Sequence, residues 1–151
     1  MKHDSLLREA HPAERPVRGV PPARAGVFSF DVPLPPRELS PNARVHWRER
    51  HRATKAYRST CAWLAKAAMP KGWKAGPVVV SAEYRCHRGV PGYLPLDIAN
   101  AQAATKAAID GFVDAGIAPN DTKRWLTWGS FVLETRKGAK PAGVTFTFEA
   151  A

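Results

Sequence analysis

The sequence lacks the apolar segments that membrane insertion or secretion requires. Its 151 residues contain no long uncharged apolar run, so we expect no transmembrane helix and no membrane partner. Near the start, Arg8, Glu9, Glu14 and Arg15 interrupt any stretch that could serve as a secretory signal. The sequence therefore predicts a cytoplasmic protein.

Cysteine is scarce, and cysteine motifs that bind metals are missing. Only Cys61 and Cys86 occur, and no CxxC motif or Cys/His cluster accompanies them, which argues against a zinc site. One disulfide could join them, but two isolated thiols in an intracellular protein are the favoured interpretation. A chain of this length favours one domain that buries a core without covalent staples.

Acidic residues are also few, and they are unevenly placed. The chain holds 13 Asp and Glu against 23 Lys and Arg, for a formal net charge of +10. Residues 37–75 hold ten Lys/Arg and two Glu, a net of +8, whereas residues 97–121 hold one Lys and four Asp, a net of −3. A basic region of this density suits a polyanion such as nucleic acid. A solubilising surface is the alternative.

Periodicity divides the chain into a tail and a domain. Prolines and mixed charges dominate residues 1–26, so we expect a flexible N-terminal tail, followed by one domain over residues 27–151. Strand patterns occur over residues 26–36, 77–87, 124–136 and 143–149, and helical spacing occurs over about residues 50–68 and 99–115. This order predicts an α+β domain, a small mixed sheet with two helices packed on one face.

The same periodicities predict the core. The apolar face of the first helix holds Ala53, Tyr57, Thr60, Cys61, Leu64 and Ala68. That of the second helix holds Ala101, Ala104, Ala108, Ile109 and Phe112. On the strand at residues 77–87, alternation leaves Ser81, Glu83 and Arg85 on the face away from the core. Trp125 and Trp128, three apart on a predicted strand, should point to opposite faces, one of them into the core.

Aspartates gather around the predicted second helix, in "LDIANAQAATKAAIDGFVDAGIAPND" at residues 96–121. Each has an ordinary structural explanation. Asp97 can cap the helix, Asp110 can pair with Lys106 four residues earlier, and Asp121 can be a turn residue. The functional alternative is that carboxylates from the two ends of the helix converge beneath a phosphate and hold magnesium, which prefers oxygen ligands.

This segment resembles the RusA family of Holliday junction resolvases, especially its phage and actinobacterial members. The family pattern is approximately Asp-x-Asp-Asn, a short insert, a lysine, "aaIDGLvDAGv" and a paired aspartate. This chain has "DIAN", "AQAAT", Lys106 and "AAIDGFVDAGIAPND". Upstream, "SPNARVHWRERHRATKAYRSTCAW" is similar to the family's "NaR.HW" motif and first helix. The resemblance covers about residues 28–149 and implies a RusA-like fold.

The resemblance implies site residues position by position. Asp97 matches the first catalytic aspartate, Asn100 the asparagine and Lys106 the functional lysine. Asp121 matches the aspartate expected to bind metal. The implied cofactor is Mg2+, with Mn2+ as the alternative ion, held by Asp97 and Asp121. Lys106 completes the implied catalytic set.

Two departures from the family pattern reduce the acidic set. Ala99 stands where the second aspartate of Asp-x-Asp-Asn is expected, and Asn120 stands at the first of the paired aspartates. Neither side chain can supply a carboxylate. The candidates to compensate are three nearby acids, Asp110, Asp114 and Glu83.

The basic segment around the start of the first helix is the candidate nucleic-acid surface. Arginine binds phosphate through paired hydrogen bonds, and together with the resemblance this density favours a DNA-binding surface over a merely solvated helix face. The predicted nucleic-acid-binding residues are Arg44, Arg48, Arg52, Lys55, Arg58 and Asn100. Trp47 could stack on a base, but a tryptophan just before a helix more often packs as a core anchor. For His46 a structural hydrogen-bonding role is at least as well supported as a catalytic one.

The sequence thus favours a metal-dependent, structure-selective endonuclease that acts on branched DNA such as four-way junctions. Such a protein is expected in the cytoplasm, associated with the nucleoid. The resemblance implies a homodimer, since two symmetric nicks need two active sites. The alternative is a junction- or DNA-binding module without nuclease activity, which Ala99 and Asn120 favour. A basic protein that binds RNA through the same surface is a third hypothesis.

Overall fold

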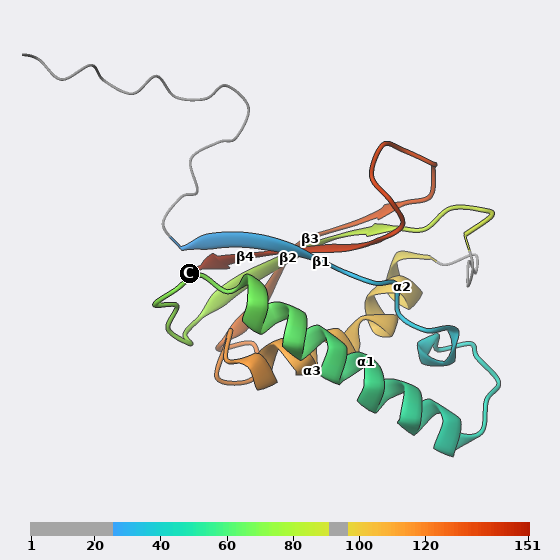
Figure 1. The fold of residues 1–151 in the computed structure, drawn as a ribbon, viewed down its shortest axis with the longest axis horizontal. Helices are drawn as coiled ribbons and strands as arrows, with labels where there is room; N and C mark the ends of the chain where they lie inside the picture. The colour runs from blue at the N-terminus through green and yellow to red at the C-terminus, as the bar shows by residue number, and fades with distance from the viewer. Residues whose placement is uncertain (1–25, 91–96) are drawn as a thin grey trace, which may run out of the picture.

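A four-stranded sheet carries all of its helices on one face (Figure 1). The computed structural model describes residues 26–90 and 97–151, so the predicted tail, apart from Gly26, lies outside the described residues. The elements are β1 (Val27–Val32), η1 (Arg37–Leu39), α1 (Trp47–Ala68), β2 (Val78–Arg85), α2 (Ile98–Ala104), α3 (Lys106–Ala115), β3 (Leu126–Glu134) and β4 (Gly143–Ala150). This confirms the predicted α+β class. Among the described residues, no helix combines the length and the apolar character that crossing a bilayer requires.

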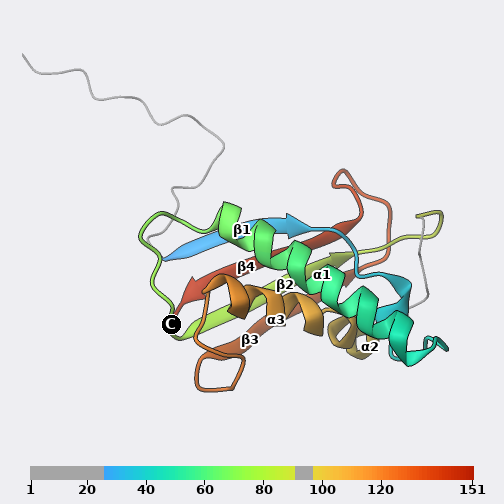
Figure 2. The ribbon, with the colours of Figure 1, turned by 60° about the horizontal axis from the view of Figure 1, so that its bottom comes forward.

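The last strand of the chain lies inside the sheet. The strand order is β1-β4-β2-β3, in which β4 is antiparallel to both β1 and β2, whereas β3 is parallel to β2. Strands β1, β2 and β3 therefore run in one direction, and their C-terminal ends lie at the same end of the sheet (Figure 2). The start of α1 and the loop between β3 and β4 lie at this end of the molecule as well.

Aromatic side chains from the central strand and from α3 form the middle of the core. Phe146 and Phe148 alternate with threonines on β4 and are fully buried. Phe112 of α3 packs edge-on against both rings, with centroid distances of 4.8 and 5.3 Å. Burying such rings is the main stabilising contribution of this layer, because each removes a large apolar area from water.

Helices α1 and α3 cross at very close range because of one glycine. A Cβ built on Gly111 would overlap the carbonyl oxygen of Arg58 and lie 3.0 Å from the amide nitrogen of Ala62. Next to this crossing, Arg58 forms two hydrogen bonds with Asp114, of 2.5 and 2.7 Å. Backbone contact and ion pair together fix α3 against α1.

The predicted first helix is correct in place but begins earlier. It starts at Trp47 rather than Arg50, because the Nδ1 atom of His46 accepts a hydrogen bond of 3.2 Å from the amide of Arg48 and caps the first turn. His46 therefore has the structural role that the sequence favoured. On the inner face Ala65 is buried, whereas Thr60, predicted to face the core, is exposed.

The predicted single helix over residues 99–115 is wrong, since α2 and α3 are separate and meet at Thr105. The hydroxyl of Thr105 donates a 2.7 Å hydrogen bond to the carbonyl of Gln102. In a continuous helix that carbonyl would accept from the amide of Lys106, so the threonine competes with the backbone and breaks the helix. The predicted apolar stripe is nevertheless buried throughout.

The prediction that Trp125 and Trp128 point to opposite faces of a strand is wrong. Trp125 lies before β3 rather than on it, and both it and Trp128 pack against the core. Arg85 is on the sheet face away from the helices, as predicted, but it is only 6% exposed. The loop that follows β3 covers it.

Candidate functional site

Three charged side chains of residues 106–121 come together at the start of α3. Lys106 is the first residue of this helix, and Asp110 follows one turn later, so both point to the same side. Asp121 comes from the loop between α3 and β3. The ammonium of Lys106 donates hydrogen bonds to both carboxylates, to Asp110 and, at 2.6 Å, to Asp121. We call these three residues the acid–lysine cluster.

The electrostatics of the acid–lysine cluster favour its charged forms. Partial burial works against the ammonium of Lys106, but the hydrogen bonds that it donates to Asp110 and Asp121 outweigh this and raise the pKa of Lys106 above its ordinary value. The hydrogen bond from Lys106 in turn lowers the pKa of the Asp121 carboxyl. The ammonium of Lys106 and the carboxylate of Asp121 are therefore both charged at neutral pH.

Lys106 and Asp121 of the acid–lysine cluster lie on the wall of a hollow between α2, α3 and the edge strand β3. This hollow has a volume of about 590 Å³. Its lining residues are Ala99, Gln102, Ala103, Lys106, Ile109, Asp121, Leu126 and Trp128. The wall is largely apolar, and the side chains of Lys106 and Asp121 bring charge to it. Such convergence of a few polar groups in an apolar hollow is typical of a binding site.

Asp97 takes the capping role that the sequence offered as an alternative, and Asn120 also has a structural role. Asp97 caps α2, since its Oδ1 atom accepts a 2.7 Å hydrogen bond from the amide of Asn100. Asn120 holds the turn before β3, since its side-chain oxygen accepts from both the amide and the hydroxyl of Thr122, at 3.0 and 2.6 Å. A carboxylate is not required for that turn. Ala99 is exposed on α2 at the edge of the hollow.

The other candidate acids lie away from the hollow lining. Asp114 is ion-paired with Arg58 of α1, and the guanidinium hydrogen bond lowers the pKa of the Asp114 carboxyl. Glu83 is on the face of β2 away from the helices, where it contacts Arg85 at 3.5 Å. Of the three predicted compensating acids, only Asp110 shares a partner with Asp121.

The predicted nucleic-acid surface is an exposed basic stripe on α1. Arg48, Arg52 and Lys55 follow at four- and three-residue steps, which places them on the helix face opposite the buried Tyr57. Arg44 precedes them and is exposed too. We call these four cations the α1 basic face. They form no ion pair within residues 26–90 and 97–151, so all four charges face solvent.

Two arginines of the same segment are engaged inside the protein. Arg50 turns back to the preceding loop and donates a 2.9 Å hydrogen bond to the carbonyl of Ala43. Arg58 keeps its guanidinium against Asp114, and that hydrogen bond raises the pKa of Arg58. A phosphate that approached Arg58 would compete with this carboxylate.

The expectation that Trp47 anchors in the core is wrong. Its side chain is 66% exposed at the first residue of α1. The guanidinium of Arg48 lies 5.3 Å from the centre of the indole ring. An exposed indole between cations offers a flat apolar surface of the kind on which unpaired bases stack.

Comparison with known proteins adds one relative. No known protein-family model matches the chain. An uncharacterized protein of Xylella fastidiosa (strain Temecula1) is 36% identical to it over 100 residues. The matched region covers 62% of this chain, and the chain likewise spans 62% of the relative's length.

The sequence located the acid–lysine cluster but missed how it is composed. It paired Asp97 with Asp121, and it explained Asp110 and Lys106 as a local helix pair. In the structure the ammonium of Lys106 donates hydrogen bonds to both Asp110 and Asp121, so these two carboxylates converge on that one cation. The four-residue step from Lys106 to Asp110 indicated that local pair, but no spacing indicated that Lys106 also contacts Asp121. Among the described residues no group of three or more His, Cys, Asp or Glu side chains forms a site for a metal ion.

Proposed function

We propose that this protein is a metal-dependent endonuclease that cuts branched DNA, as the resemblance to the RusA family implies. The observation that carries the proposal is the acid–lysine cluster. In it, Lys106 and Asp121, which match the lysine and the metal-binding aspartate of the RusA pattern, lie together at a hollow. Its carboxylates meet at a position already held by a cation, the Lys106 ammonium. That donor set fits a divalent cation with oxygen ligands.

Asp121 and Asp110 would hold the cation, and Asp97 is the further acid of the motif. A bound Mg2+ would activate water and stabilise the negative charge of the phosphate under attack. Lys106, released from one carboxylate, would donate to a phosphate oxygen where charge develops. The four cations of the α1 basic face would bind the phosphodiester backbone, so affinity should fall steeply with salt. A homodimer, also implied by the resemblance, would supply the two active sites that paired nicks need.

A cleavage assay with matched variants tests this function. A labelled four-way junction is incubated with the protein in Mg2+ and in Mn2+. Asp121→Asn should lower the cleavage rate at least about 100-fold, because it removes the acid that anchors the cluster. Asp97→Asn is informative because asparagine caps a helix as well as aspartate does, so a loss of cleavage would report on the carboxylate alone. Asp114→Asn, an aspartate ion-paired elsewhere on α3, is the control and should cut normally.

The second candidate function is a junction- or DNA-binding module that does not cut. The observation that favours it is the closure of the acid–lysine cluster, in which the ammonium of Lys106 already contacts both carboxylates. Asn120 and Ala99 also leave fewer acids than the family pattern has. Tight junction binding without cleavage in either metal, unchanged by Ala99→Asp, would establish this function and refute the nuclease.

A further inference from the structure

The loop between β3 and β4 carries a second basic cluster, apart from the α1 basic face. Residues 135–142 hold Arg136, Lys137 and Lys140, and all three side chains are exposed. Arg136 and Lys140, together with the end of β2, border a small hollow of about 160 Å³. Its lining residues are Glu83, Arg85, His87, Glu134, Arg136, Gly138, Ala139 and Lys140.

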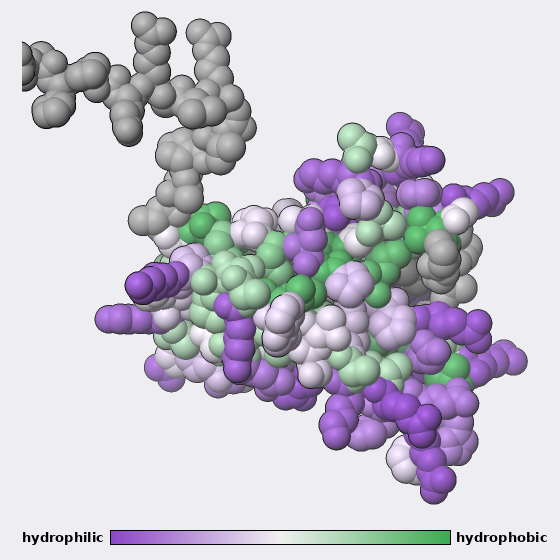
Figure 3. Space-filling view, in the orientation of Figure 1, coloured by the Kyte–Doolittle hydropathy of each residue, from purple (hydrophilic) through white to green (hydrophobic). Residues whose placement is uncertain are grey.

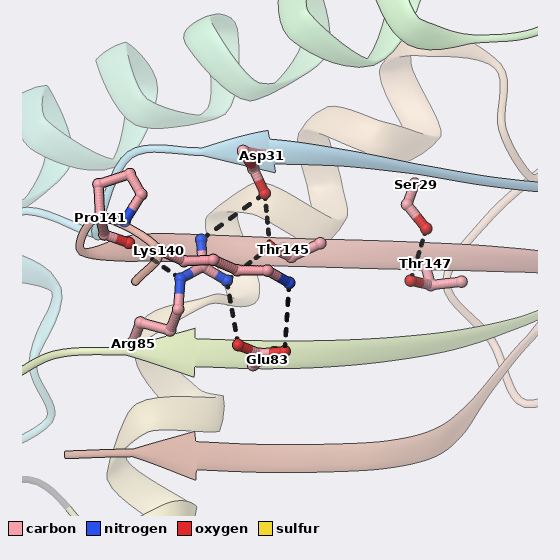
Figure 4. Close-up of polar contacts among 8 residues, drawn as sticks. All are labelled: Ser29, Asp31, Glu83, Arg85, Lys140, Pro141, Thr145 and Thr147. Atoms are coloured by element: carbon pink, nitrogen blue, oxygen red, sulfur yellow. Dashed lines mark hydrogen bonds and ion pairs between the residues drawn. The ribbon is translucent and has the colours of Figure 1, made fainter. Parts of the chain in front are cut away.

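Arg85 fixes this loop on the sheet. Its Nε donates a 2.9 Å hydrogen bond to the carbonyl of Pro141, and its NH1 nitrogen donates one of 2.6 Å to the hydroxyl of Thr145 (Figure 4). Asp31 and Glu83 lie at 3.7 and 3.5 Å from the guanidinium and balance its charge. A nearly buried arginine is tolerated because every side of it has a partner. The loop is therefore tied down at its base.

The acids of this region are used within the protein, which leaves the loop positive. Glu83 contacts Arg85 and Lys140, and a carboxylate oxygen of Glu134 accepts a 2.7 Å hydrogen bond from the backbone amide of Arg136. Within the described part of the chain, the side chains of Arg136 and Lys137 form no ion pair. Two exposed cations that form no ion pair among the described residues, on an anchored loop, suit phosphate groups.

The loop and the α1 basic face lie on opposite sides of the sheet at one end of the molecule. In Figure 1 the β3–β4 loop rises above the sheet, whereas the first turns of α1 lie below it with the other helices. Figure 3 shows hydrophilic side chains gathered over both places, with less polar surface between them. One straight duplex lying along α1 would leave the loop unoccupied.

We propose that the β3–β4 loop, through Arg136 and Lys137, contacts the backbone of a second duplex arm of a branched DNA whose first arm lies on the α1 basic face. This inference rests on the proposed function only in its nucleic-acid binding, and not on cleavage. It gives a physical basis for structure selectivity, since only a branched molecule presents phosphates to both surfaces at once.

The test compares two double variants on two DNA probes. Arg136→Ala with Lys137→Ala removes the loop cations, and Lys71→Ala with Lys74→Ala removes two exposed cations from the segment between α1 and β2, at the opposite end of the molecule. Affinities for a synthetic four-way junction and for a linear duplex of equal arm length are measured by fluorescence anisotropy over a series of salt concentrations. Melting curves establish that both variants are folded.

The loop variant should bind the junction roughly 10-fold more weakly and the duplex within about 2-fold of the wild type, and the salt slope for the junction should flatten by about 2. The control should change neither affinity by more than about 2-fold. Equal losses on both probes, equal losses in the control, or no loss in the loop variant would each overturn the inference. A structured RNA serves as a third ligand. If the loop variant loses affinity for this RNA and for neither DNA probe, the inference is overturned in favour of RNA binding.

The same titrations separate this inference from the proposed function. If the wild type binds neither DNA probe, both fail. If removing the α1 basic face abolishes binding while the loop variant binds the junction normally, only the inference about the loop fails.

Discussion

Lys106 donates a 2.6 Å hydrogen bond to Asp121, fifteen residues further along the chain. The bond ties the loop after α3 to the beginning of that helix. Because Lys106 also contacts Asp110, one ammonium neutralises two carboxylates, and any other cation that binds there must displace it or share its ligands. The chemistry of the hollow therefore depends on whether Lys106 stays in place.

Lys106→Met should raise the pKa of the Asp121 carboxyl, because the hydrogen bond from Lys106 is the main cause that lowers it. A group with a lowered pKa in the folded state stabilises the protein above its unfolded pKa, and that stability is lost as pH falls through the folded pKa. As pH falls below neutral, the free energy of unfolding should therefore decrease slightly less in the variant than in the wild type. Carboxyl NMR titration measures the pKa, with Lys55→Met as control. An unchanged Asp121 titration would contradict the assigned bond.

Arg58→Ala should weaken nucleic-acid binding less than Arg52→Ala. Both arginines are exposed on α1, but the guanidinium of Arg58 is bound to Asp114, whereas Arg52 has no ion pair in the described residues. A phosphate contact by Arg58 would first have to break that pair. Anisotropy titrations of the two variants on one DNA duplex at fixed salt measure the difference. A larger loss for Arg58→Ala would mean that the ion pair opens readily.

Gly111→Ala should destabilise the protein by about 1–3 kcal/mol, since the added methyl group has no room between α3 and the backbone of α1. Alanine would otherwise improve a helix interior, so any loss must come from packing. Urea denaturation measures the free energy of unfolding. Gly138→Ala, at a position with nothing within 4 Å of the added atom, is the matched control and should change it by less than about 0.5 kcal/mol. Equal effects would argue against the close crossing.

Arg85→Met should cost about 2 kcal/mol of folding stability and loosen the β3–β4 loop. The variant leaves the carbonyl of Pro141 without its donor and removes the counter-charge of Glu83. Urea denaturation and hydrogen exchange over residues 135–142 measure the two effects. Lys140→Met, whose contact with Glu83 is 3.9 Å long and exposed, should leave both nearly unchanged. Normal exchange in the Arg85 variant would show that the loop is held by other contacts.

Local patterns in the sequence were sufficient for the elements and for much of the core. Alternation on residues 27–32 and 143–149 identified the strands, and helical spacing identified Tyr57 and Cys61 as buried. Gly116 follows α3 in the left-handed conformation, which glycine adopts readily at the end of a helix. These features depend on neighbours within a turn or a strand, so periodicity is enough to predict them.

Competition between local bonds was harder to predict. Periodicity alone continues the second helix through residue 105, because the apolar stripe does not show that the Thr105 hydroxyl takes a backbone carbonyl. The same holds for Trp47, whose exposure depends on where α1 begins. Such outcomes depend on free-energy differences of about 1 kcal/mol between competing hydrogen bonds, which the pattern of apolar residues does not reveal.

By itself the sequence determined that this is an α+β chain with a basic first helix and an acidic segment around the second. Only the tertiary structure decided that β4 enters the sheet between β1 and β2. It also decided that Lys106 joins Asp110 to Asp121, and that the loop cations lie across the sheet from α1. The reason is that spacing fixes which side of an element a residue faces, whereas contacts between distant elements depend on how the whole chain packs.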